Sequence, residues 1–368
     1  MNLSGAFRAV SFAELPGWYD DNVSAALRAF RRSARRSTQK PYRDGALGIR
    51  SEFFETAFAE AEKIPNTPSD AEARAFFERH FQPCFINPDN DAQGFVTGYY
   101  EPELPASREP SDRFTVPLHA RPDDLVSVNE SNRPGHLDPE LRFARLSDDG
   151  LVAYFDREAI DRGALKSRGL ELCWLADPVD AFFVHIQGAA RLHMQDGGAI
   201  RVTYAAKNGY PFTAIGRVLA ESGEIAPADV TMQSIRAWLA SHPACVNMIL
   251  WKNRSYIFFR ETPLGDLNLG PIAAAKVQLE PMRSIAVDRI LHCFGTPIYV
   301  DAPGLHEVVR SPFRRLMIAQ DTGSAIRGAA RGDIFIGTGD AAGRAAGSIR
   351  HSADFYALLP RFLWEARK

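Results

Sequence analysis

The hydrophobic pattern of this chain changes its period once, near residue 94, and this change most constrains the fold. Before it, apolar residues recur at helical spacing over residues 20–36 and 51–64. A Thr-Pro-Ser-Asp run at 67–70 predicts the cap of a third helix that ends near residue 81. After it, short apolar runs alternate with turns rich in Pro, Gly and Asp, as in strands. We therefore expect an α+β chain, mainly β, that begins with helices.

The pattern after residue 94 also predicts individual elements. Strands are expected at residues 95–100, 181–188, 255–260, 284–287, 297–300, 316–319 and 333–336. A hairpin across an Asp-Gly-Gly turn is expected at residues 190–204. Two short helices are expected at residues 212–221 and 228–241. In the apolar run AFFVHIQG, interpreted as a buried strand, His185 and Gln187 share one face. These elements make up at least two β-rich units.

Composition excludes several classes of protein. The 368 residues suit two or more domains, and 45% hydrophobic with 24% charged residues is typical of a globular chain. Lys and Arg number 43 against 45 Asp and Glu, which argues against nucleic acid as the main partner. The four cysteines form no C-x-x-C pair, so they predict neither a zinc site nor a disulfide framework. We expect no metal ion and no cofactor.

The first residues bear on where the protein acts. Residues 1–19 lack the basic start, the apolar run of about 7–15 residues and the cleavage site of a signal peptide. No stretch approaches the roughly 20 apolar residues that span a bilayer. The sequence as it stands therefore predicts either a cytoplasmic protein or one whose leader lies outside it.

Two acidic residues carry the sharpest candidate chemistry. In LMIAQDTGSAI, an apolar strand runs into Asp321, and in RGDIFIG, Asp333 stands at the head of a second apolar strand. Carboxylates at the edges of adjacent buried strands suit acid–base catalysis, because burial raises the pKa of a carboxyl group. Alternatively, both acids only satisfy turn amides. An aspartic protease is disfavoured, because it needs two facing Asp-Thr-Gly loops and this chain has one.

Two other segments offer polar groups for a ligand. Tyr99 and Tyr100 are adjacent in TGYYEPEL, so on a strand one can be core and the other can face a groove. Gln187 and Asn208 lie beside glycines, and their amides suit sugar hydroxyls. The alternatives are an ordinary strand that ends at Pro102 and a simple Asn-Gly turn.

Together these segments resemble one family, the membrane-bound lytic murein transglycosylases of type A (MltA). The motifs that carry the resemblance are TGYYEPEL, DPVDAFFVHIQGAARL, RVTYAAKNGYPFTAIGRVL, MQSIRAWL and SYIFFRE, which occur in this order. The C-terminal part resembles the three-aspartate domain of that family, whose acids fall on Asp288, Asp321 and Asp333. The resemblance covers residues 96–347. The sequence departs from the family at His292 to Gly295, where an Ile-Pro-Leu-Gly turn is usual, and at Ala189, where a small hydroxyl residue is common.

The resemblance implies a discontinuous fold. A double-psi β-barrel catalytic domain with N-terminal helices would comprise residues 1–103 and 265–368. A smaller β-rich substrate-binding domain would be inserted at 104–264, with a glycan groove between the two. The implied location is the periplasm, with possible outer-membrane association through a leader absent from the sequence. The implied partner is the glycan strand of peptidoglycan, bound by a monomer.

The resemblance also implies an activity. Such a carbon–oxygen lyase, an exotransglycosylase, cleaves the β-1,4 bond between N-acetylmuramic acid and N-acetylglucosamine and leaves a 1,6-anhydro ring. Asp333 would act first as acid and then as base, while Asp321 would raise the pKa of Asp333 through like charge. Sugar contacts are expected from Tyr99, Tyr100, Gln187, Asn208 and Ser324. The open alternatives are an inverting muramidase-type hydrolase in which Asp321 activates water, a non-catalytic peptidoglycan-binding protein and a cytoplasmic protein with a repurposed fold.

Overall fold

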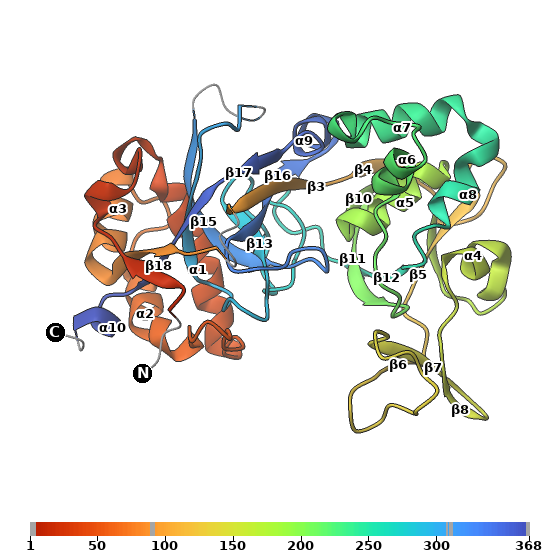
Figure 1. Cartoon of the computed structure of the whole chain (residues 1–368), viewed down its shortest axis with the longest axis horizontal. Coiled ribbons are helices and arrows are strands. Elements are labelled where there is room, and N and C mark those ends of the chain that lie inside the picture. The colour runs from red at the N-terminus through yellow and green to blue at the C-terminus, as the bar shows by residue number, and fades with distance from the viewer. Residues whose placement is uncertain (1–4, 89–92, 307, 309–311, 366–368) are drawn as a thin grey trace. The chain divides into compact units, whose positions relative to one another are not determined.

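The computed structural model describes residues 5–88, 93–306, 308 and 312–365, which fold into two compact units (Figure 1). Unit 1 comprises residues 1–100, 265–337 and 341–368, and unit 2 comprises residues 101–264 and 338–340. Unit 1 is therefore assembled from both ends of the chain, and unit 2 from its middle. The catalytic and substrate-binding roles assigned above to two such domains stay predictions.

Unit 1 combines helices from the N-terminal part with strands from both parts. Its N-terminal elements are β1 (Phe7–Ala9), η1 (Phe12–Glu14), η2 (Trp18–Asp20), α1 (Val23–Gln39), η3 (Ser51–Phe54), α2 (Glu55–Lys63), α3 (Asp70–His80), β2 (Phe81–Ile86) and β3 (Phe95–Glu101). Its C-terminal elements are β13 (Ser284–Val287), β14 (Pro297–Ala302), β15 (Phe313–Asp321), β16 (Arg331–Thr338), α9 (Asp340–Ala346), β17 (Arg350–Ser352), β18 (Asp354–Pro360) and α10 (Phe362–Glu365). The three predicted N-terminal helices are confirmed.

A nine-stranded sheet in the order β1-β2-β18-β14-β15-β13-β16-β3-β17 joins the two parts of unit 1. The pairing of these described strands begins at β1 and ends at β17, so no closed barrel is formed by hydrogen bonds. Strands β13 and β15 run parallel, whereas β13 and β16 run antiparallel. The α+β class is confirmed, and the sheet brings β3 against β16 although long stretches of chain separate them.

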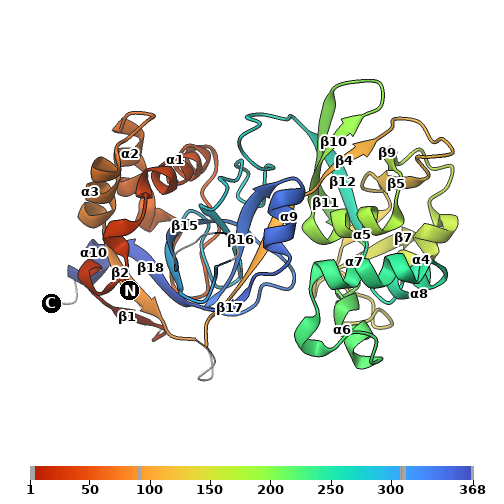
Figure 2. The same ribbon diagram turned by 90° about the horizontal axis from the view of Figure 1, so that it is seen from above.

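The N-terminal helices cover the sheet and complete the core of unit 1. Helices α1, α2 and α3 lie side by side in both views (Figure 1, Figure 2). Phe30 of α1 is fully buried, and its ring lies 5.0–5.9 Å from four other phenylalanine rings. The buried Gln320 amide of β15 donates to the Ala29 carbonyl at 2.8 Å, which fixes α1 against the strand that leads to Asp321.

Unit 2 contains small sheets and a group of helices. Its strands are β4 (Glu103–Ala106), β5 (Val116–His119), β6 (Leu125–Ser127), β7 (Phe143–Ser147), β8 (Gly150–Val152), β9 (Glu171–Leu175), β10 (Ala189–Met194), β11 (Ala199–Lys207) and β12 (Ile257–Thr262). Its helices are α4 (Arg157–Ala159), η5 (Ile160–Ala164), α5 (Pro178–Gln187), α6 (Ile215–Glu221), η6 (Pro227–Asp229), α7 (Met232–Ser241), η7 (Pro243–Cys245) and α8 (Val246–Leu250). The strands pair as β12-β11-β10-β4, β5-β9 and β6-β7-β8, and the predicted β10–β11 hairpin is confirmed.

The predicted strand at 181–188 is wrong, because these residues belong to helix α5. Asp177 caps the helix by accepting from the amides of residues 179 and 180, Pro178 starts it, and Gly188 ends it at φ 79°. Both faces of α5 are buried, so its apolar run shows no 3.6-residue period. His185 and Gln187 therefore do not share a strand face. In the part of the chain that the structure describes, no helix is both long and apolar enough to cross a membrane.

Candidate active site

Strand β13 holds the two candidate acids at one level of the unit 1 sheet. Its residue Ala286 pairs with Asp321 of β15 on one side and with Asp333 of β16 on the other. Neighbouring strands lie about 4.8 Å apart, so the backbones of the two acids are about 10 Å apart. The acids were expected on adjacent strands, but β13 lies between them. Their side chains are partly exposed.

Asp321 ends β15 and is anchored by three donors. Its Oδ1 accepts from the amides of Ala274 and Thr322 at 3.2 and 2.9 Å, and its Oδ2 accepts from the Tyr99 hydroxyl at 3.0 Å. Burial raises the pKa of Asp321 to about 6, against these hydrogen bonds, which lower it. Three of about four acceptor positions are thus occupied, which fixes this carboxyl group in place.

Asp333 has fewer partners. Its Oδ1 accepts from the Thr97 hydroxyl at 2.6 Å, and Arg331 Nη2 donates to the same hydroxyl oxygen at 2.8 Å. Among the described residues, Oδ2 of Asp333 has no hydrogen-bond partner. Burial raises the pKa of Asp333, while the Thr97 hydrogen bond and the Arg331 charge lower it. Asp333 therefore combines a raised pKa with one oxygen available to a substrate.

The expected like-charge effect of Asp321 on Asp333 is not the main cause of the raised pKa of Asp333. Burial is the leading cause of the raised pKa at both acids, and the repulsion between the two carboxylates is a small effect, the smallest of those that act on the pKa of Asp321. The reason is the environment of Asp333. Thr97 and Arg331 stand beside it, whereas β13 separates it from Asp321.

The two tyrosines of β3 point to opposite faces. The ring of Tyr99 lies 5.4 Å from that of Phe335, and burial and both acids raise the pKa of its phenol. It therefore stays a proton donor to Asp321. Tyr100 is 7% exposed, and a Cβ on Gly343 would lie 2.7 Å from its ring. Tyr100 is thus a core residue packed against α9, and we withdraw it as a sugar contact.

The remaining predicted residues are dispersed. Ser324 is exposed in the loop after β15. Gln187 and Asn208 belong to unit 2, where Gln187 is partly exposed at the end of α5. Asn208 is fully buried, and its amide is bound to the backbone of residues 155, 254 and 256 at 2.9 Å each. These bonds leave no face of Asn208 for a sugar, so we withdraw it too. Asp288 accepts from the amides of residues 290 and 328, which secures the loop after β15.

Thr97 and Arg331 are site residues that the sequence analysis missed. Thr97 precedes Tyr99 by two positions on β3, and Arg331 precedes Asp333 by two on β16. In a strand this spacing puts both members of each pair on one face, which was the available signal. In the described ranges, no group of three or more His, Cys, Asp or Glu side chains is placed to hold a metal ion.

Comparisons with family models and with known proteins show what the chain is similar to. The MltA specific insert domain matches residues 95–260, and the 3D domain matches residues 283–359. The crystal structure of a membrane-bound lytic murein transglycosylase from Agrobacterium tumefaciens is 47% identical, covers 99% of this chain and 100% of its own, and has a TM-score of 0.92. The chain belongs to the MltA family. The matched 3D domain contains all three aspartates, and the matched insert domain begins with the strand that carries Tyr99.

Other MltA proteins are more distant. The crystal structure of MltA from Neisseria gonorrhoeae in its monoclinic form is 32% identical, covers 97% of this chain and 94% of its own, and has a TM-score of 0.79. The membrane-bound lytic murein transglycosylase A of Vibrio cholerae is 30% identical over 274 residues. That match covers 71% of this chain and 64% of the relative, so the chain spans less than two thirds of its length.

Proposed function

We propose that this chain is a lytic transglycosylase that cleaves the β-1,4 bond between N-acetylmuramic acid and N-acetylglucosamine in peptidoglycan. The observation that carries the proposal is Asp333, a partly buried carboxyl group with a raised pKa and one oxygen without a partner among the described residues. A general acid needs both properties, because it must hold a proton near neutral pH and must be able to pass it on. Membership of the MltA family supplies the substrate class.

The proposed reaction needs one acid–base group and no water. Asp333 first gives its proton to the glycosidic oxygen, and the bond from this oxygen to C1 of the muramoyl sugar breaks. The C6 hydroxyl of the same sugar then forms a bond to C1 and gives its proton to the Asp333 carboxylate. The acid is regenerated, and a 1,6-anhydro ring remains. Because the nucleophile is already tethered, a second carboxylate that activates water is unnecessary.

The neighbouring residues support this division of roles. Thr97 and Arg331 favour the ionised form of Asp333, so they assist the first step, in which Asp333 gives up its proton and becomes a carboxylate. Asp321 and Tyr99 form a fixed acceptor–donor pair, and β13 lies between Asp321 and Asp333. Ser324 remains an exposed candidate for a sugar contact in unit 1, and Gln187 a partly exposed one in unit 2.

The second candidate function is an inverting hydrolase. In inverting enzymes the two carboxyl groups lie about 6.5–9.5 Å apart. The backbones of Asp321 and Asp333 are about 10 Å apart, so their carboxyl groups can adopt such a separation. Against it, three donors already occupy Asp321, which leaves it little capacity to bind and orient an attacking water.

The products separate the two reactions. Purified peptidoglycan sacculi are digested with the protein, and the fragments are analysed by mass spectrometry. The transglycosylase reaction gives anhydromuropeptides, each lighter by one water than the corresponding hydrolysis product. Asp333→Asn is the matched control and should release fragments about 10²–10⁴ times more slowly. Reducing-end muramic acid as the main product would establish the hydrolase instead.

We also infer that the protein acts in the periplasm as a monomer on glycan strands. Its relatives are named membrane-bound murein enzymes, and their substrate lies outside the cytoplasmic membrane. The acids and their hydrogen-bond partners all come from one unit of one chain, which supports a monomer. Fractionation of cells that express the natural gene tests the location. A signal found only in the cytoplasm would contradict it.

A further inference from the structure

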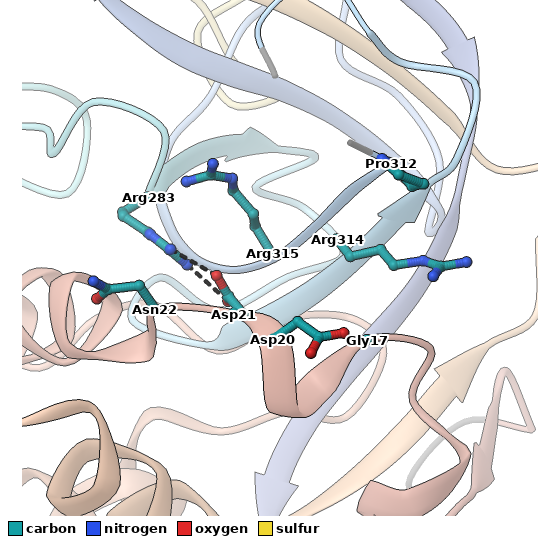
Figure 3. Close-up of a pocket in the computed structure, with 8 residues that line it drawn as sticks. All are labelled: Gly17, Asp20, Asp21, Asn22, Arg283, Pro312, Arg314 and Arg315. Atoms are coloured by element: carbon teal, nitrogen blue, oxygen red, sulfur yellow. Dashed lines mark hydrogen bonds and ion pairs between the residues drawn. The ribbon is translucent and has the colours of Figure 1, made fainter. Parts of the chain in front are cut away.

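A cavity of about 240 Å³ lies in unit 1 where β15 begins (Figure 3). Its lining includes Arg283, Arg314 and Arg315, together with the turn of residues 17–22 that leads into α1. Arg315 and Asp321 are six residues apart on β15, which corresponds to about 20 Å. The cavity is therefore separate from the acid site and plays no part in the chemistry proposed above.

Two of the three arginines are already paired with carboxylates. Arg283 donates from Nη1 and Nη2 to Asp21 at 2.8 and 2.7 Å, and the Leu316 amide donates to the same carboxylate at 2.8 Å. Arg314 donates from Nε to Asp301 at 3.0 Å. In Figure 3 the Arg314 side chain extends away from the Arg283–Asp21 pair. The charges of these two arginines are thus balanced by the protein itself.

Arg315 is different, because in the described part of the chain its guanidinium group has no hydrogen bond and no ion pair. Figure 3 shows this group beside that of Arg283. Burial, together with the charge of Arg283, lowers the pKa of Arg315, while Asp21 opposes this effect. The nitrogens of this group keep some contact with solvent, and its central carbon lies 5.8 Å from the centre of the Phe313 ring, so an anion can reach the group.

The other groups of the cavity do not supply that anion. Asp20 is exposed, and in Figure 3 its carboxylate is turned toward Gly17 and away from the Arg315 guanidinium group. Asn22 is the N-cap residue of the 17-residue helix α1, so the positive end of the helix dipole adjoins the cavity. Asp70 already accepts from the Ser24 amide, which leaves only part of this helix end for a ligand.

We propose that this cavity is a binding site for a phosphate group, held by the Arg315 guanidinium. The planar fork of arginine matches this group in bidentate geometry. A free phosphate ion and the phosphate of a lipid headgroup share this chemistry, and the experiment distinguishes them. The proposal does not rest on the proposed function, because it concerns a different part of unit 1.

Isothermal titration calorimetry of the full chain at low ionic strength tests the proposal. The probes are inorganic phosphate and the dipeptide D-alanyl-D-alanine, and the variant is Arg315→Gln. We expect saturable binding of phosphate, weakened roughly 10- to 100-fold by the substitution, as for a lost hydrogen bond to a charged group. Arg79→Gln, which removes an exposed arginine on α3, is the matched control and should bind like the wild type.

Further arms identify the source of the anion and guard against misfolding. Cosedimentation with phosphatidylglycerol vesicles that requires Arg315 and is reversed by phosphate points to a lipid, and phosphate binding without it points to the free ion. Arg315→Lys keeps the charge but loses the fork, so its affinity should lie between those of the wild type and Arg315→Gln. The proposal is overturned if the folded wild type binds the dipeptide alone or none of the three probes, or if Arg315→Gln binds as tightly as Arg79→Gln.

Discussion

Removing the Thr97 hydroxyl tests whether Asp333 is the titrating acid. In Thr97→Val, Asp333 loses the hydrogen bond of 2.6 Å that favours its ionised form. A hydrogen bond to a charged group contributes about 1.5–3 kcal/mol, and one pKa unit corresponds to about 1.36 kcal/mol. The pKa of Asp333, already raised by burial, should therefore rise by a further one to two units, approximately.

The sign of the effect on activity follows directly. Asp333 must be protonated to begin the cycle, so activity falls on the alkaline side as this proton is lost. A higher pKa keeps the proton on Asp333 to higher pH, and the alkaline limb of kcat/KM should move up by the same one to two units, approximately. The assay is the release of anhydromuropeptides from soluble glycan strands across a pH series.

Two further variants make this test specific. Thr97→Ser keeps a hydroxyl at the same place, so its alkaline limb should match that of the wild type. Thr38→Val makes the same chemical change at an exposed position on α1 and should leave the profile unchanged. An alkaline limb that stays in place in Thr97→Val, or that moves to lower pH, would refute the assignment of Asp333 as the acid.

Four other substitutions or conditions have defined outcomes. Asp333→Asn should lower turnover by about 10²–10⁴, and more than a tenth of wild-type activity would contradict this. It should not lower Tm at pH 7, because burial destabilises the ionised carboxyl group that the substitution removes. Asp321→Asn should reduce activity but barely shift the alkaline limb of the pH profile, because burial is the main cause of the raised pKa of Asp333. A large shift of this limb to lower pH would show that the charge of Asp321 is the main cause instead. Asn208→Ala should lower the free energy of unfolding by at least about 2 kcal/mol, measured in urea, because it strands buried backbone groups; its pH–activity profile should stay that of the wild type. Burial lowers the pKa of His119 to about 4, so the unfolded chain binds the extra proton first, and His119 should contribute about 3 kcal/mol to the loss of stability as pH drops from about 6.5 to about 4. A urea series in which His119→Asn shows the same pH dependence as the wild type would rule out this contribution.

Much of the local structure was predictable because it depends on local periodicity. The pattern of residues 20–36 predicts α1, and the apolar runs before Asp321 and after Asp333 predict β15 and β16. Helix α5 was misassigned because both of its faces are buried, so the polar stripe that reveals a helix is missing. Its cap at Asp177 and Pro178 was the better signal.

The environment of the acids could be predicted only in part. The identity of Asp321 and Asp333 follows from their position at strand ends, but their partners depend on strand pairing. Thr97 reaches Asp333 only because β3 pairs with β16, and nothing in the local sequence of either strand specifies that pairing. The position of β13 between the two acids is likewise a property of sheet order. Asn208 shows the converse, because its local sequence resembles a binding loop while its contacts are structural.

Digestion of sacculi in water enriched in heavy oxygen tests the central claim most directly. If the C6 hydroxyl of the muramoyl sugar is the nucleophile, no oxygen from water enters the products, and every new muramoyl end has its natural mass. If water attacks instead, each newly formed reducing end carries one heavy oxygen atom. The proposed mechanism, with Asp333 as the acid–base group, predicts unlabelled anhydro ends. Labelled reducing ends as the main product would contradict it.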